Sequence, residues 1–165
     1  MQTYLNFIHK VNRILKYIVS LVFIILSILV ILQVITRFIV DYPLSWTEEI
    51  SKYLMIYIVF LGSALAMRNH QHIAIDFLPE VLGGKNKHRL TVIVLWICIL
   101  FFGALTYYGS ILTVIVVGQA SPTLQFSMSL AYAAVPIGSI LMLLNAVAML
   151  VEMRLNNKNH GGVTR

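Results

Sequence analysis

The chain has 165 residues, of which 59% are hydrophobic and 11% are charged. Soluble domains usually carry about 25% charged residues, so this composition excludes an ordinary water-soluble domain and predicts one membrane domain over residues 1–165. The formal charge of +6 does not indicate nucleic-acid binding, because the basic residues are divided between the termini and one loop.

Two hydrophobic segments in the first half of the chain predict transmembrane helices over residues 17–40 and 47–67. The first contains twenty consecutive uncharged residues, Tyr17–Thr36, which as a helix would match the hydrocarbon thickness of about 30 Å. The second contains Lys52 near its start, whose long side chain can extend to the membrane interface. We therefore expect a helical hairpin.

The second half of the chain predicts another helical hairpin. No residue from Leu90 to Val151 is charged, and this stretch is too long for one crossing. The sequence Gly-Gln-Ala-Ser-Pro at positions 118–122 supplies the break, giving expected spans over residues 90–117 and 130–151. The predicted fold is an all-α integral membrane protein with four transmembrane helices.

Basic residues near the span ends predict the orientation. Ten of them flank the spans on the side of the two termini and the central loop, whereas Arg37 and Lys52 lie on the other side. The positive-inside rule therefore predicts an inner-membrane protein with both termini and the central loop in the cytoplasm. In the central cytoplasmic loop, apolar residues at helical spacing over residues 73–82 predict a short amphipathic helix on the membrane lipid, although Pro79 restricts it.

The ionisable residues do not suggest catalysis. All six carboxylates lie at or outside the predicted membrane boundaries, and the five histidines lie near the cytoplasmic side. An enzyme, a bound cofactor or a self-contained ion pathway would be expected to need such groups within the spans. The amides of Gln33 and Asn145 do lie within spans, where each is expected to hydrogen-bond another helix of this chain or a partner.

Small residues four apart predict close contacts between helices. Gly62 with Ala66, and Ala134 with Gly138, would each let two backbones approach.

Polar residues are densest where the second span begins. Glu48 and Glu49 favour the positive end of a helix dipole, and Trp46 and Tyr53 suit the membrane interface. Arg37 and Asp41 end the preceding span, so an ion-pair network with Glu48, Glu49 and Lys52 could fix the first hairpin or face a partner.

This segment and those that follow it resemble the small membrane subunit of tripartite ATP-independent periplasmic (TRAP) transporters, the DctQ-like family. The resemblance covers most of the chain and rests on the order of its motifs. These are Arg37 ending the first helix, Trp46 before Glu48-Glu49, a Gly62-containing helix ending at Arg68, His72 with Asp76, Ser121-Pro122-Thr123-Leu124, and Tyr132 with Ala134-Val135-Pro136-Ile137-Gly138.

The resemblance implies a role in a three-part secondary transporter. In such a system a periplasmic binding protein (P type) captures an organic acid, a large membrane subunit (M type) moves it, and this chain braces the large subunit. A sodium gradient would supply the energy, and the sodium and substrate sites would lie in the large subunit. The periplasmic residues around Glu48, Glu49 and Ser121 would contact the binding protein, whereas Arg68 and His72 would face the cytoplasmic boundary.

Two other classes of function share some of these features. A structural or assembly subunit of another membrane complex would have the same helix count and orientation, and only the motif order distinguishes it. An intramembrane enzyme would need acids, bases or ligands that the predicted spans do not contain.

Overall fold

The computed structural model describes residues 2–68 and 87–160 and is all helical there apart from loops. Its long helices are α1 (Gln2–Phe38), α2 (Ser45–Arg68), α4 (Lys87–Ile115) and α6 (Ala134–His160). The 3-10 turn η1 (Val116–Gly118) extends α4, and the short helix α5 (Ser129–Tyr132) precedes α6. The expected interfacial helix at 73–82, with His72 and Asp76, lies outside the described residues.

Four helical segments are long and apolar enough to cross a membrane, as predicted. They are Thr3–Phe38, Ser45–Arg68, Leu90–Gly118 and Ser129–Met153. A helix suits the hydrocarbon interior because it satisfies every backbone polar group within one segment. The helix α1 begins well before the first predicted span, so its polar first half extends beyond that span.

The last hairpin turns where the sequence loses its ability to continue a helix. After Gly118 the chain forms a narrow loop, in which Ser121 N–H donates to Phe126 O at 2.8 Å and Met128 N–H donates to Gln119 O at 2.9 Å. The helix then restarts at α5, and a turn at Ala133 separates α5 from α6. Pro136 lies within one helical turn of Ala133 and lacks the N–H that would donate to Tyr132 O, so a helical hydrogen bond is missing at this turn.

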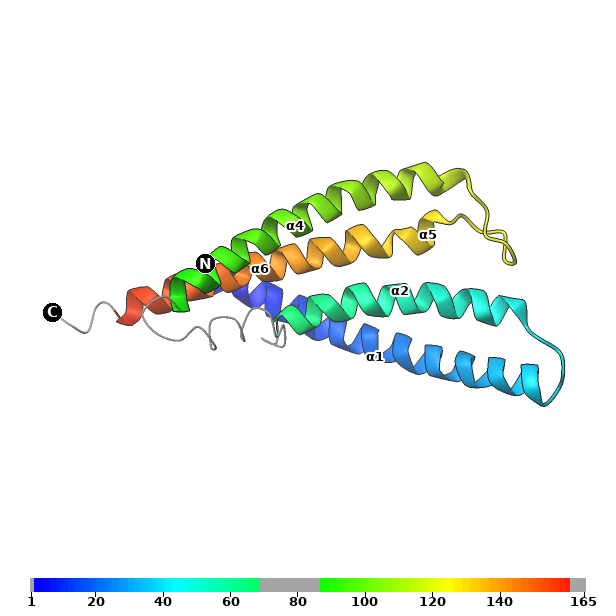
Figure 1. Cartoon of the computed structure of the whole chain (residues 1–165). Helices are drawn as coiled ribbons and strands as arrows, with labels where there is room; N and C mark the ends of the chain where they lie inside the picture. Colours follow the sequence, from blue (N-terminus) through cyan, green and yellow to red (C-terminus); the bar gives the residue numbers. More distant parts are fainter. Residues whose placement is uncertain (1, 69–86, 161–165) are drawn as a thin grey trace.

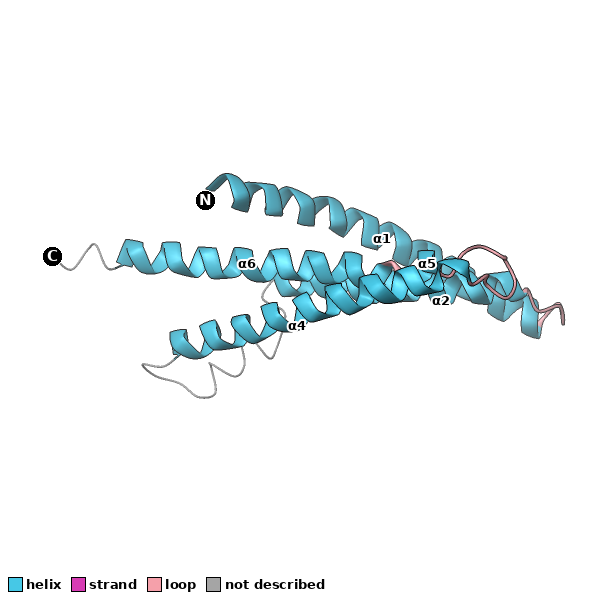
Figure 2. Cartoon of the chain, turned by 90° about the horizontal axis from the view of Figure 1, so that it is seen from above, coloured by secondary structure: helices cyan, strands magenta, loops and turns pink. Residues whose placement is uncertain are grey.

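The helices form one layer in the order α1, α2, α6, α4, as Figure 1 shows. The α1–α2 turn and the α4–α5 loop lie at one end of the layer, which we name the turn end, and the start of α1 and the end of α6 lie toward the other, the terminal end. Seen from above in Figure 2, the N-terminal part of α1 and the C-terminal part of α6 diverge toward the terminal end.

Small and flexible side chains fill the contacts between α2, α6 and α4. Ala64 of α2 and Ala146 of α6 are fully buried, and Met67, Met142 and Leu95 pack around them. In contrast, the membrane-crossing part of α1 buries almost none of its apolar side chains. Since one layer leaves both its faces open, lipid or a partner must cover these side chains.

Candidate functional site

The carboxylate of Glu49 joins α2 to the α4–α5 loop at the turn end. Tyr53 Oη donates to Glu49 Oε1 at 2.9 Å, and the backbone N–H of Thr123 donates to Oε2 at 2.8 Å. Glu49 is only 7% exposed. Both oxygens of this buried carboxylate thus accept a hydrogen bond. These bonds offset the free-energy cost of removing its negative charge from water.

Further contacts at the turn end hold the same loop against α2. The rings of Tyr53 and Phe126 meet edge to face with centroids 5.4 Å apart. One turn farther along α2, Tyr57 Oη donates to Leu130 O at 2.6 Å. We name Glu49, Tyr53 and Thr123 the Glu49 clamp, because they connect two segments that are more than seventy residues apart.

Only part of the expected ion-pair network forms. Lys52 Nζ lies 2.7 Å from Glu48 Oε1 across one helical turn, with both side chains largely exposed. The Arg37 guanidinium instead lies 6.0 Å from the centre of the Phe38 ring, and Asp41 adopts a positive φ of 53° in the α1–α2 turn. Among the described residues, the Glu49 carboxylate takes no part in this network, because it is turned inward to Tyr53 and the α4–α5 loop.

A second charged cluster lies at the terminal end. Arg68 donates from Nη1 to Glu152 Oε2 at 2.8 Å and from Nη2 to Glu152 Oε1 at 2.6 Å. His9 Nε2 lies 2.7 Å from the same Nη2. The Arg68 side chain is 9% exposed, so this bidentate pair joins α2 to α6 and also meets α1.

An amide pair crosses the layer beside this cluster. Asn145 Nδ2 donates to Ala64 O at 2.7 Å, and Asn12 Nδ2 donates to Asn145 Oδ1 at 2.7 Å. Asn145 is 2% exposed. These hydrogen bonds to α1 and α2 confirm the prediction that its amide bonds to other helices. For Gln33, the second predicted amide, no side-chain hydrogen bond forms within the described parts of the chain.

The sequence comparison identifies the family. The model of the DctQ component of tripartite ATP-independent periplasmic transporters matches residues 26–156. The chain belongs to this family.

Curated relatives of this DctQ component include named transporter proteins. It is 38% identical over 74 residues to a putative TRAP transporter small permease protein of Haemophilus influenzae, covering 45% of this chain and 46% of the relative. It is 27% identical over 139 residues to the sialic acid TRAP transporter permease protein SiaT of the same species, covering 81% of this chain and 22% of SiaT. It is 30% identical over 101 residues to the C4-dicarboxylate TRAP transporter small permease protein DctQ of Rhodobacter capsulatus, covering 60% of this chain and 44% of that protein.

The chain therefore spans less than half the length of each of these three relatives. Family membership and four helices that are long and apolar enough to cross a membrane support a multi-pass inner-membrane protein. In the described residues of this DctQ component, no three metal-ligating side chains gather into a cation site.

The two predicted small-residue contacts have different outcomes in the DctQ component. A Cβ added at Gly138 would lie 2.5 Å from Phe60 Cβ and 3.1 Å from Phe60 O, so this glycine permits α6 to approach α2 closely. At Gly62 nothing lies within 4 Å of an added Cβ. Among the described residues no other helix therefore approaches Gly62, and a close contact there with a partner helix stays a prediction.

The remaining predicted residues divide into buried and exposed groups. Ser121 is 0% exposed and Glu49 is 7% exposed, so a contact with the binding protein in this region would fall on their exposed neighbours. Glu48, Trp46, Lys52 and Pro122 remain exposed at the turn end. Sequence reasoning missed His9, Asn12 and Thr123, whose contacts depend on helices that meet only in the folded layer.

Proposed function

We propose that this chain is the small membrane subunit that braces the large permease subunit during sodium-driven uptake of an organic acid. A periplasmic binding protein would deliver that acid. Family membership supports a partner of this kind. So does SiaT, a permease in which the aligned region makes up 22% of a much longer protein.

The placement of charges supports substrate and sodium sites in the large subunit. The described carboxylates are Asp41, Glu48, Glu49 and Glu152, and each lies at or near the end of a helical segment able to cross a membrane. Transporters bind their substrates and coupling ions near the bilayer midplane, and coordinating groups are needed at that depth. The names of the relatives favour an organic anion such as a sialic acid or a C4-dicarboxylate as the substrate.

The observation that carries the bracing role is the pair of connections at the two ends of α2. The Glu49 clamp fixes its first turn to the α4–α5 loop, and Arg68 fixes its last turn to Glu152. A helix tied at both ends resists sliding relative to α6. Such a layer would serve as a stationary frame against which a partner moves its substrate in an elevator-like motion.

The open faces of the layer provide the surface for the partner. Apolar side chains such as Ile24, Ile28 and Ile31 are exposed along α1, and Gly62 leaves space beside α2 for an approaching helix. We assign the binding protein to the exposed group at the turn end, Trp46, Glu48, Lys52 and Pro122. That assignment requires the turn end to be periplasmic and both termini to be cytoplasmic.

Orientation can be tested by labelling single cysteines in intact cells. In a Cys98→Ala background, we expect Gln125→Cys in the α4–α5 loop to react with a membrane-impermeant maleimide from the periplasmic side. Asn6→Cys, near the start of α1, should react only after the cells are opened. The reverse pattern would place the binding-protein surface on the wrong side of the membrane.

Reconstitution tests the function itself. The chain is co-expressed with the permease encoded beside it, purified through a tag on this chain, and assayed in liposomes with the secreted binding protein. Co-purification, and sodium-dependent uptake that needs all three proteins, is the expected result. A stable chain that neither retains the permease nor changes uptake would contradict the proposal and favour a structural subunit of another complex.

A further inference from the structure

An open groove of about 790 Å³ lies at the terminal end of the layer, between α1, α2 and α6. Pockets that hold small ligands are usually about 300–1,000 Å³. The residues that matter for its chemistry are Arg13, Lys16 and Tyr17 of α1, Leu65 and Arg68 of α2, and Glu152 of α6.

The groove carries a surplus of positive charge. Glu152 neutralises Arg68 through the two hydrogen bonds described above. Arg13 and Lys16 are exposed, and neither side chain forms an ion pair or hydrogen bond within the described residues. Because they lie three apart on a helix, both cations project on the same side of α1.

The depth of these cations matches the headgroup layer of a membrane. Lys16 directly precedes the uncharged stretch that begins at Tyr17, and Tyr17 is a residue type enriched at membrane interfaces. Leu21 and Ile24 follow Tyr17 at helical spacing and are exposed. The same side of α1 therefore offers cations first and a strip of apolar side chains next.

We propose that this groove binds the phosphate headgroup of an anionic glycerophospholipid. Arg13 would contact the phosphate through its planar guanidinium and Lys16 as a point charge, while an acyl chain lies along Leu21 and Ile24. Basic pockets between transmembrane helices are suited to such headgroups. A free anion such as inorganic phosphate shares the charge but would not use the apolar strip.

The lipid site shares Arg68 and Glu152 with the bracing role, but its proposed phosphate contacts, Arg13 and Lys16, take no part in that role. The family match begins at residue 26, so the α1 side of the groove lies outside the matched region. The site needs only this chain, and it can be tested without the large subunit.

Native mass spectrometry of the full chain, purified in detergent and delipidated, measures the binding directly. The probes are dioleoyl phosphatidylglycerol, dioleoyl phosphatidylcholine and inorganic phosphate. We expect phosphatidylglycerol to bind at least tenfold more tightly than phosphatidylcholine. Arg13→Gln or Lys16→Gln should each weaken phosphatidylglycerol binding about fivefold, and the double variant about 30-fold.

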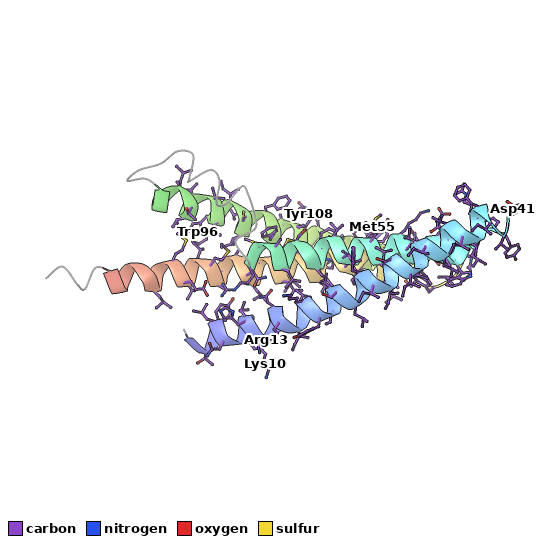
Figure 3. All side chains as sticks on the ribbon, turned by 90° about the horizontal axis from the view of Figure 1, so that it is seen from below. Lys10, Arg13, Asp41, Met55, Trp96 and Tyr108 are labelled. Carbon is purple, nitrogen blue, oxygen red and sulfur yellow. The ribbon has the colours of Figure 1, made fainter. Side chains whose placement is uncertain are left out.

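Lys10→Gln is the matched control. Lys10 is exposed on the same helix, and Figure 3 labels it beside Arg13, yet it does not line the groove. Its loss should change the affinity less than twofold, and circular dichroism should show that all variants remain helical. Equal losses for Lys10→Gln and Lys16→Gln would mean nonspecific attraction and would overturn the site. Displacement of the lipid by equimolar inorganic phosphate would also overturn it, in favour of a free-anion site.

Discussion

Arg68 donates two hydrogen bonds, at 2.8 and 2.6 Å, to the carboxylate of Glu152, a residue 84 positions farther along the chain. The Arg68 side chain is 9% exposed and that of Glu152 is 32% exposed. This pair ties the last turn of α2 to α6, and its partial burial distinguishes it from the exposed pair of Glu48 and Lys52 at the turn end.

Glu152→Gln should destabilise the chain by about 2 kcal/mol. Removing one partner of a fully buried ion pair costs about 3–5 kcal/mol, and the partial exposure of Glu152 reduces that cost. Thermal unfolding in detergent measures the change. Glu48→Gln is the control, because its exposed pair should contribute at most about 0.5 kcal/mol. Equal destabilisation by the two variants would contradict a special role for the Arg68–Glu152 pair.

Glu49→Ala should release the α4–α5 loop from α2. The Thr123 N–H loses its acceptor. Loss of a hydrogen bond that contributes about 1–2 kcal/mol should speed exchange of this N–H with deuterium about fivefold to 30-fold. Hydrogen exchange of the segment 119–128, followed by mass spectrometry, measures the effect. The exchange rate of the Glu49→Gln variant should fall between those of the unchanged chain and Glu49→Ala. The glutamine amide oxygen can still accept from the Thr123 N–H while its NH₂ donates to Tyr53 Oη.

Glu48→Ala serves as the control for this experiment. Within the described residues, the Glu48 carboxylate accepts a hydrogen bond from Lys52 and none from the α4–α5 loop, so exchange in the loop should stay unchanged. If exchange rises equally in the Glu48 and Glu49 variants, the Glu49 clamp does not hold the loop.

Gly138→Ala and Gly62→Ala should have opposite effects on stability. At Gly138 the new methyl group would meet the Cβ and backbone of Phe60, and such overpacking costs about 1–3 kcal/mol. At Gly62 the space is open, so the better helix propensity of alanine should leave the isolated chain unchanged or stabilise it by up to about 1 kcal/mol. Denaturation of the two variants in the same detergent compares them.

Phe60→Ala should fail to rescue Gly138→Ala, because the clash involves the Cβ and backbone that alanine retains. Rescue would show that the ring of Phe60, and not the approach of the two backbones, sets the spacing between α2 and α6.

Asn12→Ala and Asn145→Ala should be coupled in a double-mutant cycle. Their side chains bond to each other, and Asn145 also bonds to Ala64 O. Polar pairs between membrane helices contribute about 0.6 kcal/mol on average and up to about 1.7 kcal/mol, and the burial of Asn145 places this pair toward the upper value. A coupling energy of zero, measured by unfolding in detergent, would mean that the two amides act independently.

Several features were predictable because they depend on neighbouring residues alone. The run Tyr17–Thr36 and the uncharged stretch from Leu90 to Val151 require membrane helices, and Gly118 and Pro122 require a break between the last two. Asn145 required a hydrogen-bond partner on another helix, because an unpaired amide in hydrocarbon is costly. The motif order from Arg37 to Gly138 was sufficient to identify the family.

The pairing of residues could not be predicted in the same way. Gly62 and Gly138 are both small residues with a small neighbour four positions away, yet only Gly138 faces another helix of this chain. Glu48 and Glu49 are adjacent and chemically alike, but one is exposed and the other is buried under Thr123. One step along a helix turns a side chain by about 100°, so the rotation of α2 within the layer decides their roles.

By itself, the sequence predicted four helices that are long and apolar enough to cross a membrane, because the cost of placing polar groups in hydrocarbon depends only on local composition. Only the tertiary structure decided the order α1, α2, α6, α4 of the single layer, and with it the Arg68–Glu152 pair, the Glu49 clamp and the cationic groove. Helix adjacency depends on how side chains from distant segments fit together, and an apolar stretch reads the same whether it faces lipid or another helix.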